Sequence, residues 1–440
     1  MTVNKIHVKA PGGWMNDPNG FIYYKGEYHL FYQYFPYDTR WGTMRWGHAV
    51  SRDLVVWEHR GVALFPTICE DQNGCFSGSA LEYDGKMYLF YTGVHYHKPD
   101  PKDIHHCLDE QFDSAQLMLC SEDGKHFDNF KGKQVIIPPI EDKRVGDRTH
   151  TRDPKVWRGR NGWYLVLGST TEDGRGKLLF YKSNDLASWS YVNSVSHEPH
   201  WGWMWECPEY LETEGGNVLL LSSMGIIKDG KREENQIICA AVDFEEKGCV
   251  MSLPDTFQYA DHGLDLYATQ SIKDEEGRQI MVAWLRMPEA VDGEWIGMLC
   301  MPRVIEVKEG FVYFRPHPNV ESRYTRQITA PSEADEAGYR VSLDMEEGER
   351  LDIGGYQIFR EGNRIHTDRS AVFGGHKEYR LAFETPELRS GCHLDIYVSS
   401  NIVEVFINQG EYVISNAVYG LTGKLQFDSM ERLRLCTLES

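Results

Sequence analysis

The feature that most constrains the fold is an internal repeat. A glycine followed at once by an apolar, strand-forming run occurs five times, at Gly26, Gly85, Gly162, Gly216 and Gly277. The spacings between them are 59, 77, 54 and 61 residues, and each interval has room for four short strands with their turns. Helical periodicity is scarce, and Val, Ile, Tyr, Phe and Trp dominate the apolar runs. The repeat therefore predicts an all-β fold, with a five-bladed β-propeller over residues 1–315.

The rest of the chain has a different pattern. Residues 316–330 contain Pro316, Pro318 and several charged residues, which is typical of a linker. In residues 331–440 apolar and polar residues alternate, as at Leu394–Val398, and turns such as Asn408–Gly410 follow. This pattern predicts a β-sandwich. We expect it to contribute packing and stability, with sugar binding as the lesser alternative.

Three acidic residues recur at one phase of the repeat. Asp17, Asp153 and Glu206 precede the glycine of their own repeat by nine or ten residues, and Ser77 precedes its glycine by eight. Equal phase in a radial repeat means an equal position in each blade, here the first strand, and first strands line the central channel of a propeller. The sequence therefore predicts that these acids, far apart in the chain, converge on one axial pocket.

Two carboxyl groups that face one pocket are the minimum equipment for retaining glycoside hydrolysis, in which they lie about 5–5.5 Å apart. Glu206 stands between Trp205 and Cys207-Pro208, and apolar neighbours favour the protonated form that a general acid requires. Asp17 lies in a turn whose amides favour its ionised form. The tryptophans nearby provide flat faces for sugar rings or, for about half of them, packing between blades; they are at positions 14, 41, 46, 201, 203 and 205.

Four motifs carry a resemblance to a known family. They are Trp14–Gly20 (WMNDPNG), Phe76–Ser79 (FSGS), Arg152–Pro154 (RDP) and Glu206–Pro208 (ECP). In this order and spacing the chain resembles glycoside hydrolase family 32, the invertases and β-fructofuranosidases, and Ile402–Phe406 is similar to the sandwich of that family. The resemblance covers nearly the whole chain and implies a propeller followed by a sandwich.

The resemblance also implies roles for individual residues. Asp17 would be the nucleophile, Glu206 the acid/base, and Asp153 with Arg152 would hold fructose hydroxyl groups and stabilise the transition state. The fructose pocket would be lined by Asn16, Gln33, Trp41, Phe76 and Ser77, and by the less certain matches Tyr267 and Trp284. Neither a metal nor an organic cofactor is implied.

The substrate that this resemblance implies is sucrose or a short fructo-oligosaccharide. Two alternatives share the covalent intermediate: a hydrolase specific for sucrose 6-phosphate, and a fructosyltransferase. A non-catalytic sugar-binding protein is disfavoured by the three acids in phase, and an inverting arabinan hydrolase by the motif at 14–20.

Basic residues could bind a phosphate on the leaving sugar. Residues 141–160 hold seven basic residues against four acidic ones, and Arg45 stands where the family often has histidine. Arg45, Arg144 and Arg148 are the candidate phosphate ligands, although a solvated loop is the favoured interpretation of the basic stretch.

A histidine-rich insertion, residues 95–107, lengthens the second repeat. It contains His95, His97, His105, His106 and Cys107, but their spacing matches no standard metal site. We expect this insertion to form a loop at the rim of the pocket.

Composition limits the partners and the compartment. A formal charge of −20 would repel nucleic acids and anionic membranes. No apolar run approaches the length of a membrane span, and residues 1–13 lack the pattern of a signal peptide. The ten cysteines form no CxxC pair and are expected to be reduced. A cytoplasmic protein that acts on a small sugar, without nucleic acid or membrane, is therefore predicted.

Overall fold

The computed structural model describes residues 2–228, 231–232, 235–335, 337–376 and 378–439. Strands form nearly all of the regular structure in these ranges, and α1 (Pro318–Glu321) is the one α-helix within them. The all-β prediction is therefore confirmed. None of the helices in the described ranges is long and apolar enough to cross a membrane.

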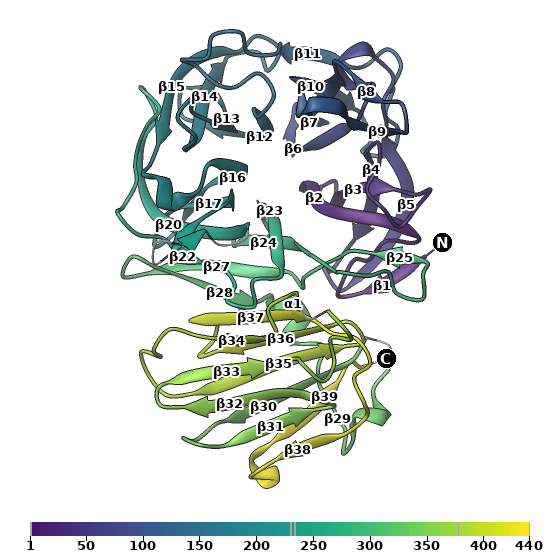
Figure 1. The fold of residues 1–440 in the computed structure, drawn as a ribbon, viewed down its shortest axis with the longest axis vertical. Coiled ribbons are helices and arrows are strands. Elements are labelled where there is room, and N and C mark those ends of the chain that lie inside the picture. Colours follow the sequence, from purple (N-terminus) through teal and green to yellow (C-terminus); the bar gives the residue numbers. More distant parts are fainter. Residues whose placement is uncertain (1, 229–230, 233–234, 336, 377, 440) are drawn as a thin grey trace.

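Most strands before residue 317 belong to five consecutive sheets, which we call the N-terminal sheets (Figure 1). The first has the order β1 (Val3–Lys5), β5 (Val56–Leu64), β4 (Arg45–Ser51), β3 (Glu27–Phe35), β2 (Gly13–Tyr24) and β25 (Trp295–Ile296). The second has the order β11 (Gln134–Ile137), β10 (Phe112–Ser121), β7 (Lys86–Tyr96) and β6 (Cys75–Tyr83).

The other three N-terminal sheets repeat this plan. The third is β12 (Arg152–Gly159), β13 (Gly162–Thr170), β14 (Gly176–Ser183) and β15 (Ser190–Ser196). The fourth is β16 (Met204–Thr213), β17 (Gly216–Met224), β20 (Gln236–Glu245) and β21 (Val250–Ser252), with β22 (Gln258–Tyr259) beside β20. The fifth is β23 (Leu266–Lys273), β24 (Gln279–Leu285), β27 (Arg303–Lys308) and β28 (Phe311–Pro316), with β26 (Met298–Leu299) beside β24.

The first strands of these sheets are neighbours in a closed circle. β2 contacts β6, β6 contacts β12, β12 contacts β16, β16 contacts β23, and β23 returns to β2. Figure 1 shows the five strands around a common centre, with the later strands of each sheet further out. Side chains near the same end of these five strands therefore meet, although they are far apart in the sequence.

The five repeat glycines lie at the tight turns between the first and second strands. Each has a positive φ, from 72° at Gly85 to 144° at Gly216, a backbone conformation that glycine adopts at little cost. At Gly26 and Gly85 the preceding residue also has a positive φ, as in the hairpin turns that match strand twist. The repeat found in the sequence is thus the first hairpin of each N-terminal sheet.

Two further sheets, the C-terminal sheets, pack face to face (Figure 1). One is β29 (Arg326–Gln327), β39 (Arg434–Thr437), β30 (Tyr339–Asp344), β35 (His393–Ser399), β36 (Ile402–Ile407) and β37 (Tyr412–Ala417). The other is β34 (Ala382–Glu384), β33 (Arg364–Asp368), β32 (Tyr356–Glu361), β31 (Arg350–Ile353) and β38 (Leu425–Phe427). Val341, Ile396 and Val405 from one sheet and Leu351 and Ile358 from the other share one buried cluster.

The segment expected to be a linker contributes to this packing. It contains α1 and β29, and β29 pairs with β39. The N-terminal and C-terminal sheets share one buried apolar cluster, to which Ile305 and Phe406 belong, and buried charges. Arg303 of β27 is fully buried and donates to Asp261, to Glu404 of β36 and to Ser415 of β37. All ten cysteines lie in the described part of the chain and have free thiols.

Candidate active site

The same irregularity interrupts the first strand of every N-terminal sheet. Pairing with the second strand shifts register between Met15 and Pro18, Cys75 and Gly78, Arg152 and Lys155, Glu206 and Glu209, and Tyr267 and Thr269. Such β-bulges redirect side chains and are common beside active sites. The predicted residues Asp17, Ser77, Asp153, Glu206 and Tyr267 lie within or at the edge of these five bulges.

Proline explains part of this pattern. Pro18, Pro154 and Pro208 follow directly in the bulged segments, and proline within sheets is confined to edges and bulges because it cannot donate to the ladder. Asp153 and Cys207 have φ values of 66° and 44°, which are unusual for residues with side chains and cluster at functional sites. The strand ends are thus shaped to present particular side chains.

Asp17 is held on both oxygens. Oδ2 accepts a hydrogen bond of 2.6 Å from Ser77 Oγ, and Oδ1 accepts one of 3.0 Å from Asn16 Nδ2. Burial raises the pKa of Asp17 above its ordinary value, and the charge of Glu206 adds to this, while the hydrogen bonds from Ser77 and Asn16 oppose it. The carboxylate is therefore fixed in orientation.

Asp153 lies close to Asp17, and Cys207 joins them. The amide of Cys207 donates to Asp153 Oδ2 at 2.8 Å. Its sulfur lies 3.6 Å from Asp153 Oδ2 and 3.8 Å from Asp17 Oδ2. Burial raises the pKa of Asp153 to about 7, against the lowering effect of Arg152.

Glu206 is held by two partners from different sheets. Oε1 accepts from Arg152 Nη2 at 2.7 Å and Nε at 2.9 Å, and Oε2 accepts from the Tyr267 hydroxyl at 2.5 Å. The indole of Trp205 is fully buried and donates to the carbonyl of Trp201. The polar partners Arg152 and Tyr267 therefore contact this carboxyl group, in contrast to the apolar surroundings expected from its sequence neighbours.

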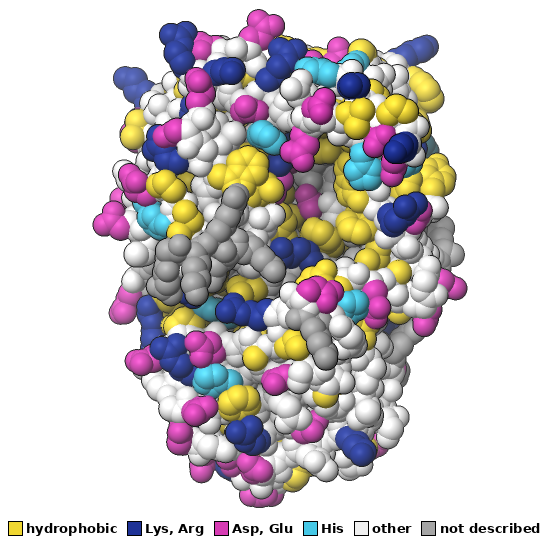
Figure 2. All heavy atoms as spheres, in the orientation of Figure 1, with side chains coloured by type: hydrophobic (Ala, Val, Ile, Leu, Met, Phe, Trp, Pro, Cys, Tyr) yellow, Lys and Arg dark blue, Asp and Glu magenta, His cyan; other side chains and the backbone are white. Residues whose placement is uncertain are grey.

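All eleven predicted site residues line one cavity of about 500 Å³. They are Asn16, Asp17, Gln33, Trp41, Phe76, Ser77, Arg152, Asp153, Glu206, Tyr267 and Trp284. Figure 2 shows the hollow on this face of the N-terminal sheets, with hydrophobic side chains in its walls and acidic ones within it. The volume is typical of sites for small ligands.

Five of the six candidate tryptophans divide into two groups, and Trp203, whose ring centre lies 5.3 Å from that of His150, belongs to neither. Trp46, Trp201 and Trp205 are at most 1% exposed and belong to packing clusters. Trp14 and Trp41 line the cavity. Trp14 donates through Nε1 to Asn16 at 2.8 Å, which places a polar atom of the indole next to the residue that orients Asp17. The expectation that about half of the tryptophans are packing residues agrees with this division.

Several cavity residues were not predicted as site residues. Met44, Tyr96, Glu110, Phe112 and His150 line it, together with His106 and Cys107 of the histidine-rich insertion. The one sequence signal for most of them was the longer second repeat, which indicated a rim loop but no particular side chain. In the structure this insertion includes β8 (Pro99–Asp100) and β9 (Asp103–Cys107), and the 3-10 turn Leu108–Glu110 follows it.

The histidines of the insertion have separate partners. His97 pairs with Asp113 at 2.7 Å, His105 with Thr43 Oγ1 at 2.8 Å, and His106 with Asp103 at 3.1 Å. Over the described ranges no group of three or more His, Cys, Asp or Glu side chains is placed to hold a metal ion.

The arginines proposed as phosphate ligands are engaged elsewhere. Arg144 pairs with Asp142 at 2.6 Å, and Arg148 pairs with Asp113 at 2.6 Å. Arg45 donates to the carbonyl of Thr43 at 2.8 Å and lies over the Tyr37 ring. None of the three is among the described residues that line the cavity, so a phosphate there would have to draw them away from their partners.

Comparison with known proteins identifies the family. Residues 7–316 match the family described as Glycosyl hydrolases family 32 N-terminal domain, and residues 312–431 match Glycosyl hydrolases family 32 C terminal. A sucrose-6-phosphate hydrolase of Bacillus subtilis is 30% identical, over 95% of this chain and 89% of the relative. A raffinose invertase of Escherichia coli is 32% identical, over 94% of this chain and 89% of the relative.

Solved structures agree with the sequence comparison. A family 32 β-fructofuranosidase of Bombyx mori superposes with a TM-score of 0.82 and 26% identity, over 98% of this chain and 93% of that one. A sucrose-6-phosphate hydrolase of Lactobacillus gasseri has the same fold, with a TM-score of 0.84 and 24% identity, over 99% of this chain and 93% of that one. As its motifs predicted, the chain belongs to glycoside hydrolase family 32.

Proposed function

We propose that this chain is a retaining β-fructofuranosidase that hydrolyses the terminal β-D-fructofuranosyl bond of sucrose or short fructo-oligosaccharides. One observation carries the proposal: carboxyl groups from three separate sheets line one cavity, and each has fixed partners. Ser77 and Asn16 hold Asp17, Cys207 holds Asp153, and Arg152 with Tyr267 holds Glu206. A solved complex of a Bombyx mori β-fructofuranosidase variant with sucrose supports the choice of substrate.

In the first chemical step the ionised Asp17 attacks C2 of the fructosyl unit. The bond from C2 to the bridging oxygen breaks, and Glu206 gives its proton to that oxygen, so that glucose leaves as a neutral alcohol. The products of this step are a fructosyl ester on Asp17 and an ionised Glu206. The hydroxyl of Tyr267 and the guanidinium of Arg152 then stabilise the new negative charge on Glu206.

In the second step water releases the sugar. Glu206 takes a proton from the water molecule as its oxygen attacks C2, and the bond between C2 and the carboxylate of Asp17 breaks. Two displacements at C2 retain the β-configuration. Asp153 takes no part in bond making; it binds fructose hydroxyl groups, and with a pKa of about 7 it both donates and accepts hydrogen bonds near neutral pH.

The proposal includes the architecture that presents these groups. The five N-terminal sheets form a five-bladed β-propeller over residues 1–315, residues 316–330 connect it, and a β-sandwich occupies residues 331–440. The closed circle of contacts among β2, β6, β12, β16 and β23 supports five blades. The protein is proposed to act in the cytoplasm on small sugars, without nucleic acid or membrane partners and without a cofactor.

A hydrolase specific for sucrose 6-phosphate is the second candidate, and it is supported by relatives that are sucrose-6-phosphate hydrolases, such as that of Bacillus subtilis. The engagement of Arg144 and Arg148 by acidic side chains supports the neutral substrate instead. The test is kcat/KM for sucrose, sucrose 6-phosphate, kestose, inulin and levan. We expect sucrose and kestose to lead. A preference of tenfold or more for sucrose 6-phosphate would select the second candidate, and oligosaccharide synthesis at high sucrose would indicate a transferase.

A further inference from the structure

The C-terminal sheets hold the loop that leads into the catalytic strand β23. This loop, residues 261–265, carries two carboxylates. Asp261 Oδ1 accepts from the amide of Ser415 at 2.8 Å. Asp265 Oδ2 accepts from the amide of Ala417 at 2.9 Å. Both amides belong to β37, so the loop is fixed to a strand of the other part of the molecule.

Arg369 completes this attachment. Its guanidinium forms a fork with the carboxylate of Asp265, Nη2 to Oδ1 at 3.1 Å and Nη1 to Oδ2. Arg369 is 1% exposed, donates to the carbonyls of Ala417 and Arg380, and lies 3.5 Å from the centre of the Phe373 ring. A buried, planar, multiply bonded guanidinium has one available orientation, so it fixes the position of Asp265.

Asp265 is two residues before Tyr267, whose hydroxyl donates to Glu206 Oε2 at 2.5 Å. Arg286 joins the same turn: its amide donates to the carbonyl of Asp265 at 3.0 Å, and its guanidinium lies 5.4 Å from the Tyr267 ring. Ala268, which follows Tyr267, has a φ of 48°. Tyr267 therefore lies at a strand end with an unusual backbone conformation. The described contacts of Asp265 outside the N-terminal sheets are with β37 and Arg369.

We propose that Arg369 is a positioning residue for catalysis, acting through Asp265 and Tyr267 on Glu206. This inference rests on the proposed role of Glu206 as acid/base. It gives the C-terminal sheets a part in the reaction, because they fix the position of the Tyr267 hydroxyl, which stabilises the charge on Glu206 after proton transfer. Misplacement of such a group by a fraction of an ångström to 1 Å lowers rates by about 10- to 100-fold.

The test compares two substrates that differ in their need for a proton. Sucrose needs protonation of its leaving oxygen, whereas β-D-fructofuranosyl fluoride does not, and kcat/KM reports the first chemical step alone for both. Arg369→Gln should lower kcat/KM for sucrose at least tenfold and for the fluoride less than twofold. Arg369→Lys keeps the charge but loses the fork, and serves as the second variant if Arg369→Gln does not fold.

A matched control separates positioning from stability. Ile358→Ala opens a cavity in the core between the C-terminal sheets, where Ile358 is fully buried, and does not touch the loop. At a loss of melting temperature equal to that of the Arg369 variants, Ile358→Ala should change kcat/KM for both substrates by the same factor. Equal losses on both substrates in the Arg369 variants would overturn the inference. Failure of the proposed function can be distinguished from failure of this inference. If Glu206 is not the acid, Glu206→Gln would also lower kcat/KM equally for sucrose and for the fluoride.

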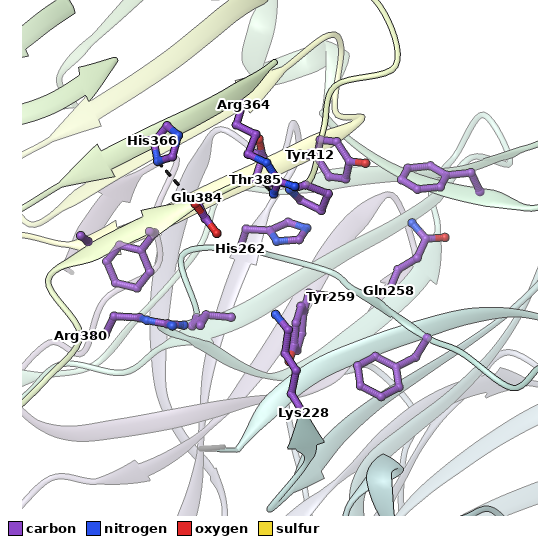
Figure 3. A pocket seen from close by; sticks show the side chains of 16 residues that line it. Lys228, Gln258, Tyr259, His262, Arg364, His366, Arg380, Glu384, Thr385 and Tyr412 are labelled. Atoms are coloured by element: carbon purple, nitrogen blue, oxygen red, sulfur yellow. Dashed lines mark hydrogen bonds and ion pairs between the residues drawn. The ribbon is translucent and has the colours of Figure 1, made fainter. Parts of the chain in front are cut away.

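A second inference comes from a separate cavity of about 560 Å³ between the N-terminal and C-terminal sheets (Figure 3). Its lining includes the basic residues Lys228, Arg364 and Arg380, and Glu384 is the one acidic residue among the described lining residues. Figure 3 shows Arg380 extending from the left and Lys228 from below, toward the space beneath His262. The lining therefore carries three cations against one anion, in a chain whose net charge is −20.

The basic residues of this cavity differ in whether they already have hydrogen-bond or ion-pair partners. Arg364 donates to the carbonyl of Thr385 at 3.0 Å, and Glu384 pairs with His366 at 3.6 Å. Within the described ranges the guanidinium of Arg380 forms no hydrogen bond or ion pair, and Lys228 only lies over the Tyr259 ring, 5.4 Å from its centre. Two cations, both exposed, thus line this cavity without a described hydrogen-bond or ion-pair partner.

Aromatic rings form the rest of the wall. Tyr259, His262, Tyr412 and Phe311 follow one another in edge-to-face contacts with centroids 5.2–5.8 Å apart. Cations bind phosphate oxygens, and ring faces cover the apolar face of a sugar. We infer that this cavity binds a phosphorylated monosaccharide, with the phosphate between Arg380 and Lys228.

Isothermal titration calorimetry on the full chain tests this with glucose 6-phosphate, glucose and inorganic phosphate. Glucose 6-phosphate should bind at least tenfold more tightly than either of the others. Arg380→Ala and Lys228→Ala should each weaken it tenfold or more, and Arg160→Ala, which removes an exposed cation from the turn between β12 and β13, should not. Absence of binding, equal binding of inorganic phosphate, or loss in Trp41→Ala instead, which would place the ligand in the catalytic cavity, would each overturn the inference.

Discussion

The hydroxyl of Tyr267 lies 2.5 Å from Oε2 of Glu206, and its second contact is the carbonyl of Ser222 at 3.0 Å. Burial, together with the charge of Glu206, holds the pKa of this phenol well above its ordinary value. Tyr267 is therefore a permanent donor. Arg152 occupies the other carboxylate oxygen of Glu206, so both oxygens are fixed by groups from sheets other than its own.

Removal of this hydroxyl should slow the reaction without unfolding the protein. A hydrogen bond to a charged group contributes about 1.5–3 kcal/mol, so Tyr267→Phe should lower kcat/KM for sucrose by about 10- to 100-fold. Steady-state kinetics at matched folded fraction provide the measurement. An unchanged rate would show that this contact has no part in proton transfer.

The role of Glu206 as the acid can be separated from a role in binding. Glu206→Gln should lower kcat/KM for sucrose by about 10²–10⁴-fold, the usual contribution of general acid catalysis. For β-D-fructofuranosyl fluoride the loss should be much smaller, because fluoride leaves without a proton. Equal losses on the two substrates would assign Glu206 to substrate binding.

Ser77 should set the acid limb of the pH profile. Its hydrogen bond lowers the pKa of Asp17 against the raising effect of burial, and the nucleophile must be ionised. In Ser77→Ala the pKa of Asp17 rises further, so the acid limb of kcat/KM should move to higher pH. Ser79→Ala is the matched control, since Ser79 Oγ donates to the carbonyl of Pro154; a limb that moves equally in both variants would contradict the assignment.

Asp153 should reduce stability at high pH. Its pKa is about 7 in the folded chain against an ordinary 3.8. The stability that protonated Asp153 contributes is therefore fully present below its pKa in the unfolded chain, and it is lost as the pH rises through 7. Asp153→Asn removes the buried charge and should raise stability at pH 8, on the order of 1–4 kcal/mol, while activity falls. The gain should shrink at pH 5.

Thermal unfolding of both proteins at the two pH values measures this difference. Asp142→Asn, at an exposed carboxylate paired with Arg144, should show no gain at pH 8. A gain for Asp153→Asn that is the same at pH 5 and pH 8 would show that the effect is packing and not charge.

The sequence was informative about the site because its residues recur at fixed positions in a repeated hairpin. The glycine at each turn sets the start of each second strand, so counting back from Gly26 or Gly216 reaches the same height in every first strand. The bulges were not visible in advance. A register shift depends on hydrogen bonds between two strands, and only Pro18, Pro154 and Pro208 indicated that the ladder is broken there.

Contacts that depend on tertiary packing could not be predicted from the sequence. Trp205 is adjacent to Glu206 in the chain, yet successive side chains of a strand point to opposite faces, so its indole lies in the core. Arg148 pairs with Asp113, 35 residues away, which no local pattern announces. Glu110 and Phe112 follow the insertion and line the cavity beside His106 and Cys107, a placement that the length of the second repeat does not indicate.

The central claim is that Asp17 forms a covalent bond to the fructosyl unit. The direct measurement is mass spectrometry of Glu206→Gln after mixing with β-D-fructofuranosyl fluoride, because this variant forms the ester without an acid but lacks the base that hydrolyses it. One fructosyl group should accumulate on the peptide that contains Asp17, and Asp17→Asn in the same background should abolish it. An adduct on another residue, or product of inverted configuration without any adduct, would contradict the account.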